Sequence, residues 1–354
     1  MVKYLHKLGH TIIIYTARRM KTHKGNIGKI LADIGQITFD TLHKFEIPYD
    51  EIVFGKPYAD YYIDDLAISS YSNLEKELGY HNTSTHARDF NTIENVDFET
   101  IKKSSNDLSN EIFYYLNIPL NVKQYFPELY DFDKEACKWY EMEKINGVIL
   151  SRLYLSEELT TSMLKNLITT LHFIQNSSAP PPNNIDIYGN YTSKLKQRYS
   201  SYDYSTFPNS EHVYEQLINN LNQYKNNNLG KIKVIHGDPV FTNILVDSYN
   251  NFKFIDMRGK IGEIYTIFGD WLYDWAKIYQ SLIGYDEILE DIDIDFNYKN
   301  NMIDFFKTEF INMYTESDFE NLKVITKSLL FSLIPLHNNN KCVKYYNLCS
   351  SIYL

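Results

Sequence analysis

The segment VIHGDPVFTNILV, residues 234–246, contains three polar side chains that could take part in chemistry: His236, Asp238 and Asn243. Asp238 offers a carboxylate that can orient a hydroxyl group and accept its proton. Asn243 follows five residues later, and Asp256 ends the next apolar run, NNFKFID. Carboxylate and carbonyl oxygens are ligands that Mg²⁺ prefers. A turn that only joins two strands would also place polar residues here, so the surrounding elements must decide.

A hairpin is predicted to carry these groups. Apolar β-branched and aromatic residues indicate a strand before the loop, a strand at 243–246, and a third strand that ends in Asp256. The DSYNN segment between the last two strands is typical of a turn. Polar groups at fixed offsets on a hairpin favour an active site over an ordinary turn. We place His236 in the same catalytic loop, where we expect it to support the loop through hydrogen bonds.

The order His-x-Asp-x-x-x-x-Asn, followed by an apolar strand ending in Asp, resembles the catalytic and metal-binding loops of kinase-fold phosphotransferases. It is most similar to the aminoglycoside phosphotransferase and choline kinase branch, in which Gly-Asp replaces the Arg-Asp of protein kinases. The resemblance implies that Asp238 acts as the base and that Asn243 and Asp256 bind Mg²⁺. It also implies ATP as the phosphoryl donor and a small-molecule acceptor.

Two further segments extend this resemblance. GDWLYDWAKIYQSLIG is similar to the family's Gly-Asp…Tyr-Asp-x-Ala-Lys segment, which implies that Asp274 braces the catalytic loop. An ordinary helix-surface Asp is the alternative. IDMRG resembles a subgroup found beside capsule and cell-surface polysaccharide genes. Arg258 in this segment would contact phosphate or an acidic acceptor, or else pair with a surface carboxylate.

The nucleotide-binding part of the fold is less complete in the sequence. Kinase folds place a strand Lys on the nucleotide phosphates and pair it with a helix Glu. TIKKSSNDLSNEIFYY offers Lys103, or Lys102, together with Glu111. No Gly occurs at 81–101, so we expect the Gly-rich phosphate loop to be shortened or replaced by side chains.

The first 80 residues carry a separate set of polar groups. IIIYTAR, FGKP and YYIDDLA resemble, in that order, the second, third and fourth motifs of haloacid dehalogenase-like phosphatases. The resemblance implies that Thr16 and Lys56 bind a phosphoryl group, and that Asp64 and Asp65 help to hold Mg²⁺. A hydroxyl and an ammonium group suit phosphoryl oxygens, because both donate hydrogen bonds to them.

The first motif of that family, an Asp-x-Asp that contains the nucleophile, is missing, because no Asp precedes Asp33. We therefore expect a truncated gene product or a module kept as a scaffold. A phosphatase whose nucleophile lies in a longer form of the gene product is the alternative.

Composition limits the remaining possibilities. The 354 residues are 44% hydrophobic and 23% charged, with a formal net charge of −10, which argues against a nucleic-acid-binding protein. We expect no membrane insertion and a cytoplasmic location, because no apolar run approaches membrane-spanning length. Three Cys are too few and too scattered for a disulfide framework or a zinc site. The oligomeric state is not predicted.

Taken as a whole, the sequence predicts an α/β, Rossmann-like remnant of a haloacid dehalogenase-like domain at 1–80 and a linker at 81–92. An α+β, two-lobed kinase-like domain follows, with a small lobe at 93–148 and a helical lobe at 149–354. The predicted activity is ATP- and Mg²⁺-dependent phosphorylation of a hydroxyl group on a sugar, amino alcohol or similar metabolite. A pseudokinase that binds nucleotide without turnover is the alternative. The acidic run 286–296 would attract a cationic acceptor or form a solvated helix end.

Overall fold

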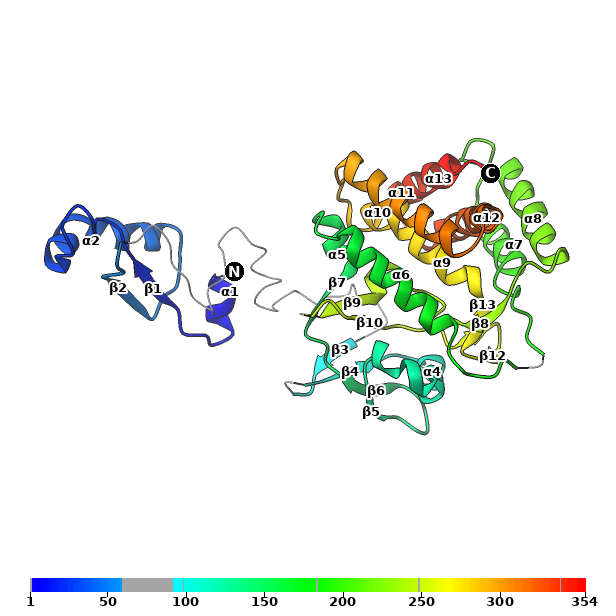
Figure 1. Ribbon diagram of the computed structural model, residues 1–354, viewed down its shortest axis with the longest axis horizontal. Coiled ribbons are helices and arrows are strands. Elements are labelled where there is room, and N and C mark those ends of the chain that lie inside the picture. The colour runs from blue at the N-terminus through cyan, green and yellow to red at the C-terminus, as the bar shows by residue number, and fades with distance from the viewer. Residues whose placement is uncertain (1, 59–91, 98, 183, 248, 338) are drawn as a thin grey trace. The chain divides into compact units, whose positions relative to one another are not determined.

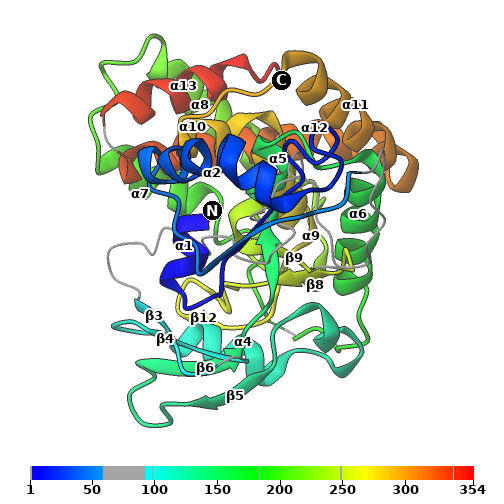
Figure 2. The same ribbon diagram turned by 90° about the vertical axis from the view of Figure 1, so that its left-hand side faces the viewer.

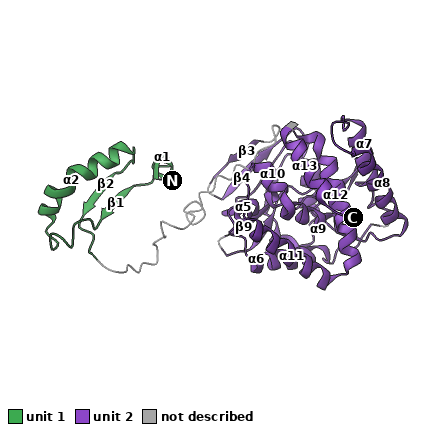
Figure 3. Ribbon diagram, turned by 90° about the horizontal axis from the view of Figure 1, so that it is seen from above, with its two compact units in different colours: residues 1–81 green, residues 82–354 purple. Residues whose placement is uncertain are grey.

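The computed structural model describes residues 2–58, 92–97, 99–182, 184–247, 249–337 and 339–354. It divides the chain into two compact units, residues 1–81 and 82–354, which are coloured separately in Figure 3. Asp64, Asp65 and the predicted linker up to residue 91 lie outside the described residues.

The first unit contains a strand–helix–strand motif. Strands β1 (Ile13–Thr16) and β2 (Glu51–Phe54) pair in parallel, and helix α2 (Ile27–Lys44) connects them; a short helix, α1 (Val2–Lys7), precedes β1. The side chain of Asn26 caps α2 by accepting a hydrogen bond from the backbone N–H of Lys29 at 3.1 Å. The helix buries Ile30 and Ile34, which form a small core with Phe54. The alternation predicted from the sequence is therefore present in this segment.

The second unit begins with a small antiparallel sheet. Strands β3 (Thr92–Asn95), β4 (Thr100–Ser104), β5 (Leu129–Phe132) and β6 (Trp139–Glu143) lie in the order β3-β4-β6-β5. Helix α4 (Ser109–Asn117) and the 3₁₀ turn η1 (Leu120–Tyr125) follow β4 (Figure 1). Side chains alternate across a strand, so Lys103 of β4 is buried while Lys102 lies 3.9 Å from the ring centroid of Trp139.

Short strands connect this sheet to the helices. In Figure 1, β9 (Ile244–Asp247) and β10 (Phe252–Phe254) lie between the four-stranded sheet and the helical part of the unit, and Figure 2 shows β9 in the same place. They form an antiparallel sheet with β7 (Gly147–Ile149), in the order β10-β9-β7. Strand β8 (Ile232–Val234) pairs with β13 (Phe268–Asp270), and β11 (Lys260–Ile261) pairs with β12 (Ile264–Tyr265).

The predicted hairpin is present, but its boundaries differ from those expected. Asn243 lies in a 3₁₀ turn, η2 (Phe241–Asn243), because its N–H bonds to the carbonyl oxygen of Val240 at 2.8 Å; it is not the first residue of the strand. Strand β10 ends at Phe254, so Asp256 lies beyond the strand, with a φ of 60°. Asn243 and Asp256 therefore both lie outside the strands, so the alternation of side chains in a sheet does not fix their directions.

Helices form the rest of the second unit and contain most of its core. They are α5 (Leu150–Leu155), α6 (Thr161–Gln175), α7 (Thr192–Ser200), α8 (Ser210–Asn226), α9 (Trp271–Gln280), the π-helical turn η3 (Ser281–Tyr285), α10 (Asp286–Glu290), α11 (Phe296–Met313), α12 (Glu316–Leu333), η4 (Ile334–Leu336) and α13 (Asn339–Ser351). One continuous apolar cluster extends from Leu108 to Ile352 and includes the buried Trp271 and Trp275 of α9. In the part of the chain that the structure describes, no helix is both long and apolar enough to cross a membrane.

Candidate active site

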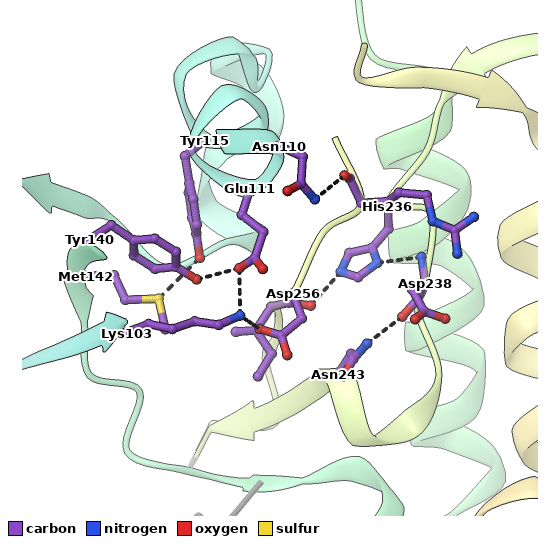
Figure 4. A network of polar contacts seen from close by, with 12 residues as sticks. Lys103, Asn110, Glu111, Tyr115, Tyr140, Met142, His236, Asp238, Asn243 and Asp256 are labelled. Carbon is purple, nitrogen blue, oxygen red and sulfur yellow. Dashed lines mark hydrogen bonds and ion pairs between the residues drawn. The ribbon is translucent and has the colours of Figure 1, made fainter. Parts of the chain in front are cut away.

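An ion-paired lysine lies at the centre of the site. The Nζ atom of Lys103, on β4, lies 2.7 Å from Oε2 of Glu111, on α4, and 2.7 Å from Oδ1 of Asp256 (Figure 4). Lys103 is only 2% exposed. Burial lowers the pKa of Lys103, but the carboxylates of Asp256 and Glu111 outweigh this effect and raise it. The lysine is therefore charged and held in one position.

Tyrosine and sulfur contacts fix the glutamate and the sheet behind it. The hydroxyl of Tyr140 donates a hydrogen bond of 2.8 Å to Oε2 of Glu111. Tyr140 lies opposite Lys103 in the β4–β6 register, and the hydroxyl of Tyr115 contacts the sulfur of Met142 at 3.2 Å. Burial raises the pKa of Glu111. The structure thus brings together the lysine and glutamate that the sequence offered and selects Lys103 over Lys102 for this contact.

Helix α4 lies directly against the loop that carries Asp256. The side-chain amide of Asn110 donates a 2.7 Å hydrogen bond to the carbonyl oxygen of Arg258. Gly259 has a φ of 63°, and a Cβ atom there would lie 1.9 Å from the carbonyl oxygen of Asn110. Glycine is therefore required for this close approach. The approach brings the carboxylates of Glu111 and Asp256 within ion-pair distance of the same residue, Lys103.

The catalytic-loop segment is held from within by His236. Its Nε2 atom lies 2.8 Å from the carbonyl oxygen of Ile255, and the backbone N–H of Asp238 donates to its Nδ1 atom at 3.1 Å. This network assigns the neutral tautomer that carries its proton on Nε2. Burial lowers the pKa of His236 to about 4. A neutral, buried imidazole of this kind fits a supporting role and not that of a proton acceptor for a substrate.

Asp274 holds the same loop from helix α9. Its Oδ2 atom accepts a hydrogen bond of 2.7 Å from the backbone N–H of His236, and its Oδ1 atom accepts one of 2.8 Å from that of Gly237. Asp274 is fully buried and does not lie on a helix surface. Burial raises its pKa to about 7, against the two backbone hydrogen bonds, which lower it.

The side chain of Asn243 is directed toward the backbone of Asp238 (Figure 4). The amide nitrogen of Asn243 donates a 2.9 Å hydrogen bond to the carbonyl oxygen of Asp238. This contact sets the orientation of the amide group, so that its oxygen remains available as a ligand. The Asp256 carboxylate and the Asn243 amide oxygen form a hard-oxygen donor set that suits Mg²⁺ when phosphate oxygens complete the shell. Within the described ranges, no group of three or more His, Cys, Asp or Glu side chains is arranged to hold a metal ion alone.

Three side chains near Asp238 were not assigned from the sequence. Lys277 of α9 places Nζ 2.9 Å from Oδ1 of Asp238. Tyr273, one helical turn earlier on α9, accepts a 2.6 Å hydrogen bond from Nη1 of Arg258. Lys194 of α7 interacts electrostatically with Tyr273, Arg258, Lys277 and Asp238. The i, i+4 spacing of Tyr273 and Lys277 within YDWAK was the available signal, because it places both on one helix face.

Arg258 contacts a tyrosine and not the surface carboxylate that was one alternative. Its guanidinium carbon lies 5.0 Å from the centroid of the Tyr273 ring, and its backbone N–H donates to the carbonyl oxygen of His236 at 3.0 Å. The guanidinium is therefore fixed beside the catalytic loop.

In the first unit, Thr16 and Lys56 are neighbours. Thr16 ends β1 and lies opposite Phe54 in the parallel register. The backbone N–H of Lys56 donates to the carbonyl oxygen of Thr16 at 3.2 Å. Both residues thus lie at the carboxyl edge of the two strands, as the sequence predicted, whereas Asp64 and Asp65 lie outside the described residues.

Comparison with solved structures identifies the fold of the second unit. A choline/ethanolamine kinase family protein from Mesorhizobium loti matches with a TM-score of 0.52 at 11% identity, over 74% of this chain and 85% of that chain. A choline kinase from Streptococcus pneumoniae gives a TM-score of 0.49 at 15% identity, over 73% and 88% of the two chains. A glucosamine kinase in complex with glucosamine, ADP and inorganic phosphate gives 0.49 at 12% identity, over 74% and 75%.

The first of these matches confirms the predicted protein-kinase-like fold, and at such low identity the likeness is one of fold alone. Neither family models nor curated protein sequences gave a match to the chain. The haloacid dehalogenase-like assignment of the first unit stays a prediction.

Proposed function

We propose that this protein transfers the terminal phosphoryl group of ATP to a hydroxyl group of a small metabolite, such as a sugar or an amino alcohol. The observation that carries the proposal is the buried Lys103, which joins Glu111 of α4 to Asp256 across the fold at 2.7 Å from each carboxylate. Phosphoryl transfer needs chiefly positioning and charge neutralisation, and these are what such a network supplies. The IDMRG segment supports a role in surface polysaccharide biosynthesis.

Each residue of the site has a defined task in this proposal. Lys103, fixed by Glu111, binds the phosphate oxygens of the nucleotide. Asp256 and Asn243 would hold Mg²⁺, which would supply charge neutralisation for phosphoryl transfer. Asp238 orients the acceptor hydroxyl and takes its proton while the hydroxyl oxygen bonds to the terminal phosphorus and the bond from that phosphorus to the ADP oxygen breaks. His236 and Asp274 are positioning residues, because they contact the loop backbone and not the reactants.

Calorimetric titration of the purified chain with Mg-ATP tests the nucleotide half of the proposal. We expect Lys103→Met and Asp256→Ala each to weaken Mg-ATP binding by about tenfold or more, because each removes a charge-assisted contact. Lys102→Met is the matched control for the lysine, since Lys102 is the next residue of the same strand and lies over Trp139. Asp304→Ala, on the exposed face of α11, is the control for the carboxylate. Parent-like binding by Asp256→Ala would contradict the proposal.

Turnover distinguishes a kinase from a protein that only binds nucleotide. The absence of Gly at 81–101 is the feature that favours the second possibility. Slow hydrolysis of ATP without an acceptor, lost in Asp238→Asn but kept in the two control variants, would support transfer. Tight Mg-ATP binding without any hydrolysis would support the pseudokinase alternative.

We propose separately that the first unit is a haloacid dehalogenase-like, phosphate-binding module. The parallel β1–α2–β2 arrangement and the adjacency of Thr16 and Lys56 at one strand edge support this assignment. A hydroxyl and an ammonium group at one edge suit a phosphoryl group. Phosphorus NMR of the full chain with inorganic phosphate tests it: Lys56→Gln should weaken binding by about fivefold or more, whereas Lys24→Gln, an exposed lysine of the same unit, should not. Equal binding by both variants would count against the assignment.

A further inference from the structure

Cationic side chains gather around Asp238 on the side that faces the helices. Lys277 of α9 pairs with the Asp238 carboxylate at 2.9 Å, and Arg258 bonds to the Tyr273 hydroxyl at 2.6 Å. Lys194, in the first turn of α7, interacts electrostatically with both of these cations and with Tyr273. We refer to Lys194, Arg258 and Lys277 as the cationic cluster.

The cluster is built into the fold and is not a set of mobile surface side chains. The side chain of Lys277 is only 12% exposed, and Lys194 and Arg258 are also partly buried. Arg258 is fixed at three points: its N–H bonds to the carbonyl oxygen of His236, its carbonyl oxygen accepts from Asn110, and its guanidinium lies on Tyr273. Bringing three cations together in a partly buried site is unfavourable unless an anion balances them.

The three cations face two carboxylates, Asp238 and Asp274, both of which act on Arg258. Asp238 is paired with Lys277, and Asp274 lies behind the loop, where its two oxygens accept backbone hydrogen bonds. The remaining neighbour, Tyr273, responds to the excess. Burial raises the pKa of Tyr273, but Arg258, Lys194 and Lys277 outweigh it and lower the pKa to about 8.

The opposite imbalance occurs on the other side of the site. There a single ammonium group, Lys103, faces two carboxylates, Glu111 and Asp256, an arrangement that suits a metal ion bound with nucleotide phosphates. The excess of positive charge thus lies around the proposed base, where an acceptor hydroxyl would bind, and the metal-binding loop carries the excess of negative charge.

We propose that the acceptor carries an anionic group, a carboxylate or a phosphate, that binds the cationic cluster of Lys194, Arg258 and Lys277 while its hydroxyl group meets Asp238. The inference rests on the proposed phosphotransferase function and narrows its substrate class. The anionic group does not react; it anchors the acceptor through charge-assisted hydrogen bonds.

Members of the acidic run 286–296 differ in their surroundings. Asp286 is fully buried, and Asp291 pairs with Lys344. Asp295 caps helix α11 by accepting a hydrogen bond from the N–H of Tyr298 at 2.9 Å. These contacts give Asp291 and Asp295 a structural role within the helical part of the unit.

Four compounds that share one glucopyranose ring test the proposal: glucuronate, glucose 6-phosphate, glucose and glucosamine. Calorimetric binding to the full chain is measured for each, with and without Mg-ATP, and phosphorylated products are followed by phosphorus NMR. We expect at least one of the two anions to bind about tenfold more tightly than glucose or glucosamine, because it gains charge-assisted contacts. Comparison of the two anions distinguishes a carboxylate from a phosphate ligand.

Variants of helix α7 show where the anion binds. We expect Lys194→Gln to lower the affinity for the preferred anion by about tenfold more than the affinity for Mg-ATP. Lys194→Arg should restore most of this affinity, and Lys196→Gln, an exposed lysine on the same helix, should leave it unchanged. Thermal melting of each variant checks that it is folded.

Three outcomes would overturn the proposal. One is equal or tighter binding of glucose or glucosamine, and another is no binding of any anion by a protein that binds Mg-ATP. The third is an equal loss of anion and Mg-ATP affinity in Lys194→Gln, which would assign the cluster to the terminal phosphate of the nucleotide. Failure of the function itself gives a different result, because Mg-ATP then does not bind while anion binding to the cluster can still be measured.

Discussion

Tyr273 reports on the electrostatics of the site at the scale of a single residue. Its hydroxyl accepts a hydrogen bond from Arg258 at 2.6 Å, and its ring lies beneath the guanidinium. Burial alone would raise its pKa, yet the three neighbouring cations lower the pKa to about 8. On the same helix, burial raises the pKa of Tyr279 to about 12, so the lowered pKa of Tyr273 is distinctive.

We predict that one tyrosine ionises near pH 8, about two units below an unperturbed tyrosine. Absorbance of tyrosinate at the red edge of the tyrosine band, recorded against pH, should show this step in the parent and in Tyr279→Phe but not in Tyr273→Phe. Lys194→Gln should move the step to higher pH, because it removes a cation. If the titration curve of the parent matches that of Tyr273→Phe, then the neighbouring cations do not lower the pKa of Tyr273.

The same shift has a defined effect on stability. Because the pKa is lower in the folded state, ionisation of Tyr273 stabilises the fold fully above the unfolded pKa, and this contribution disappears as the pH falls through about 8. The difference in free energy of unfolding between the parent and Tyr273→Phe should therefore grow as the pH rises from about 8 to about 10.

Residues that follow one another closely in the sequence could be predicted from the local pattern, whereas Lys103 and Glu111 were expected from the kinase resemblance. Asp238, Asn243 and Asp256 have fixed offsets on one hairpin, so their proximity follows from local structure. Lys277 and Tyr273 were visible in YDWAK, but their contact with Asp238 and Arg258 depends on how α9 packs against the loop. Lys194 lies on α7 in a segment without a motif, and only the tertiary fold brings it to the site.

At the scale of elements, the contact between α4 and the Asp256 loop determines whether the lysine network can form. The kinase-fold pattern led us to expect a strand lysine and a helix glutamate here, but nothing local indicates that α4 approaches a loop 148 residues away through Asn110. Gly259 allows the approach because its φ of 63° and the absence of a Cβ atom leave room for the Asn110 carbonyl. The ring of Phe113, also on α4, lies 5.5 Å from that of Tyr265 and extends the contact.

The hairpin boundaries illustrate the limit of pattern reading for elements. Apolar residues at 244–246 and 252–255 gave the two strands, but the pattern could not show that Asn243 closes a 3₁₀ turn. Nor could it show that Asp256 adopts positive φ, a conformation that is uncommon for residues other than Gly. Both departures place a functional side chain in a loop, where it can reach a ligand.

At the scale of the whole molecule, each unit has its own hydrophobic core. The large core is formed by residues from Leu108 to Ile352, whereas the described core of the first unit consists of Ile30, Ile34 and Phe54 with a few partly buried neighbours. All the residues of the proposed kinase site, from Lys103 to Lys277, belong to the second unit. The net charge of −10 describes the whole chain and does not indicate that this site contains several lysine and arginine side chains.

We predict that a chain beginning at Thr92 folds by itself and binds Mg-ATP within about twofold of the full chain, because its core and its proposed ligands are all retained. Thermal melting should show the same main transition in both proteins, since the large core dominates unfolding. The truncated chain carrying Asp256→Ala is the control and should lose the nucleotide-dependent increase in melting temperature. If the truncated chain folds but binds Mg-ATP about tenfold more weakly, then residues before Thr92 contribute to the nucleotide site.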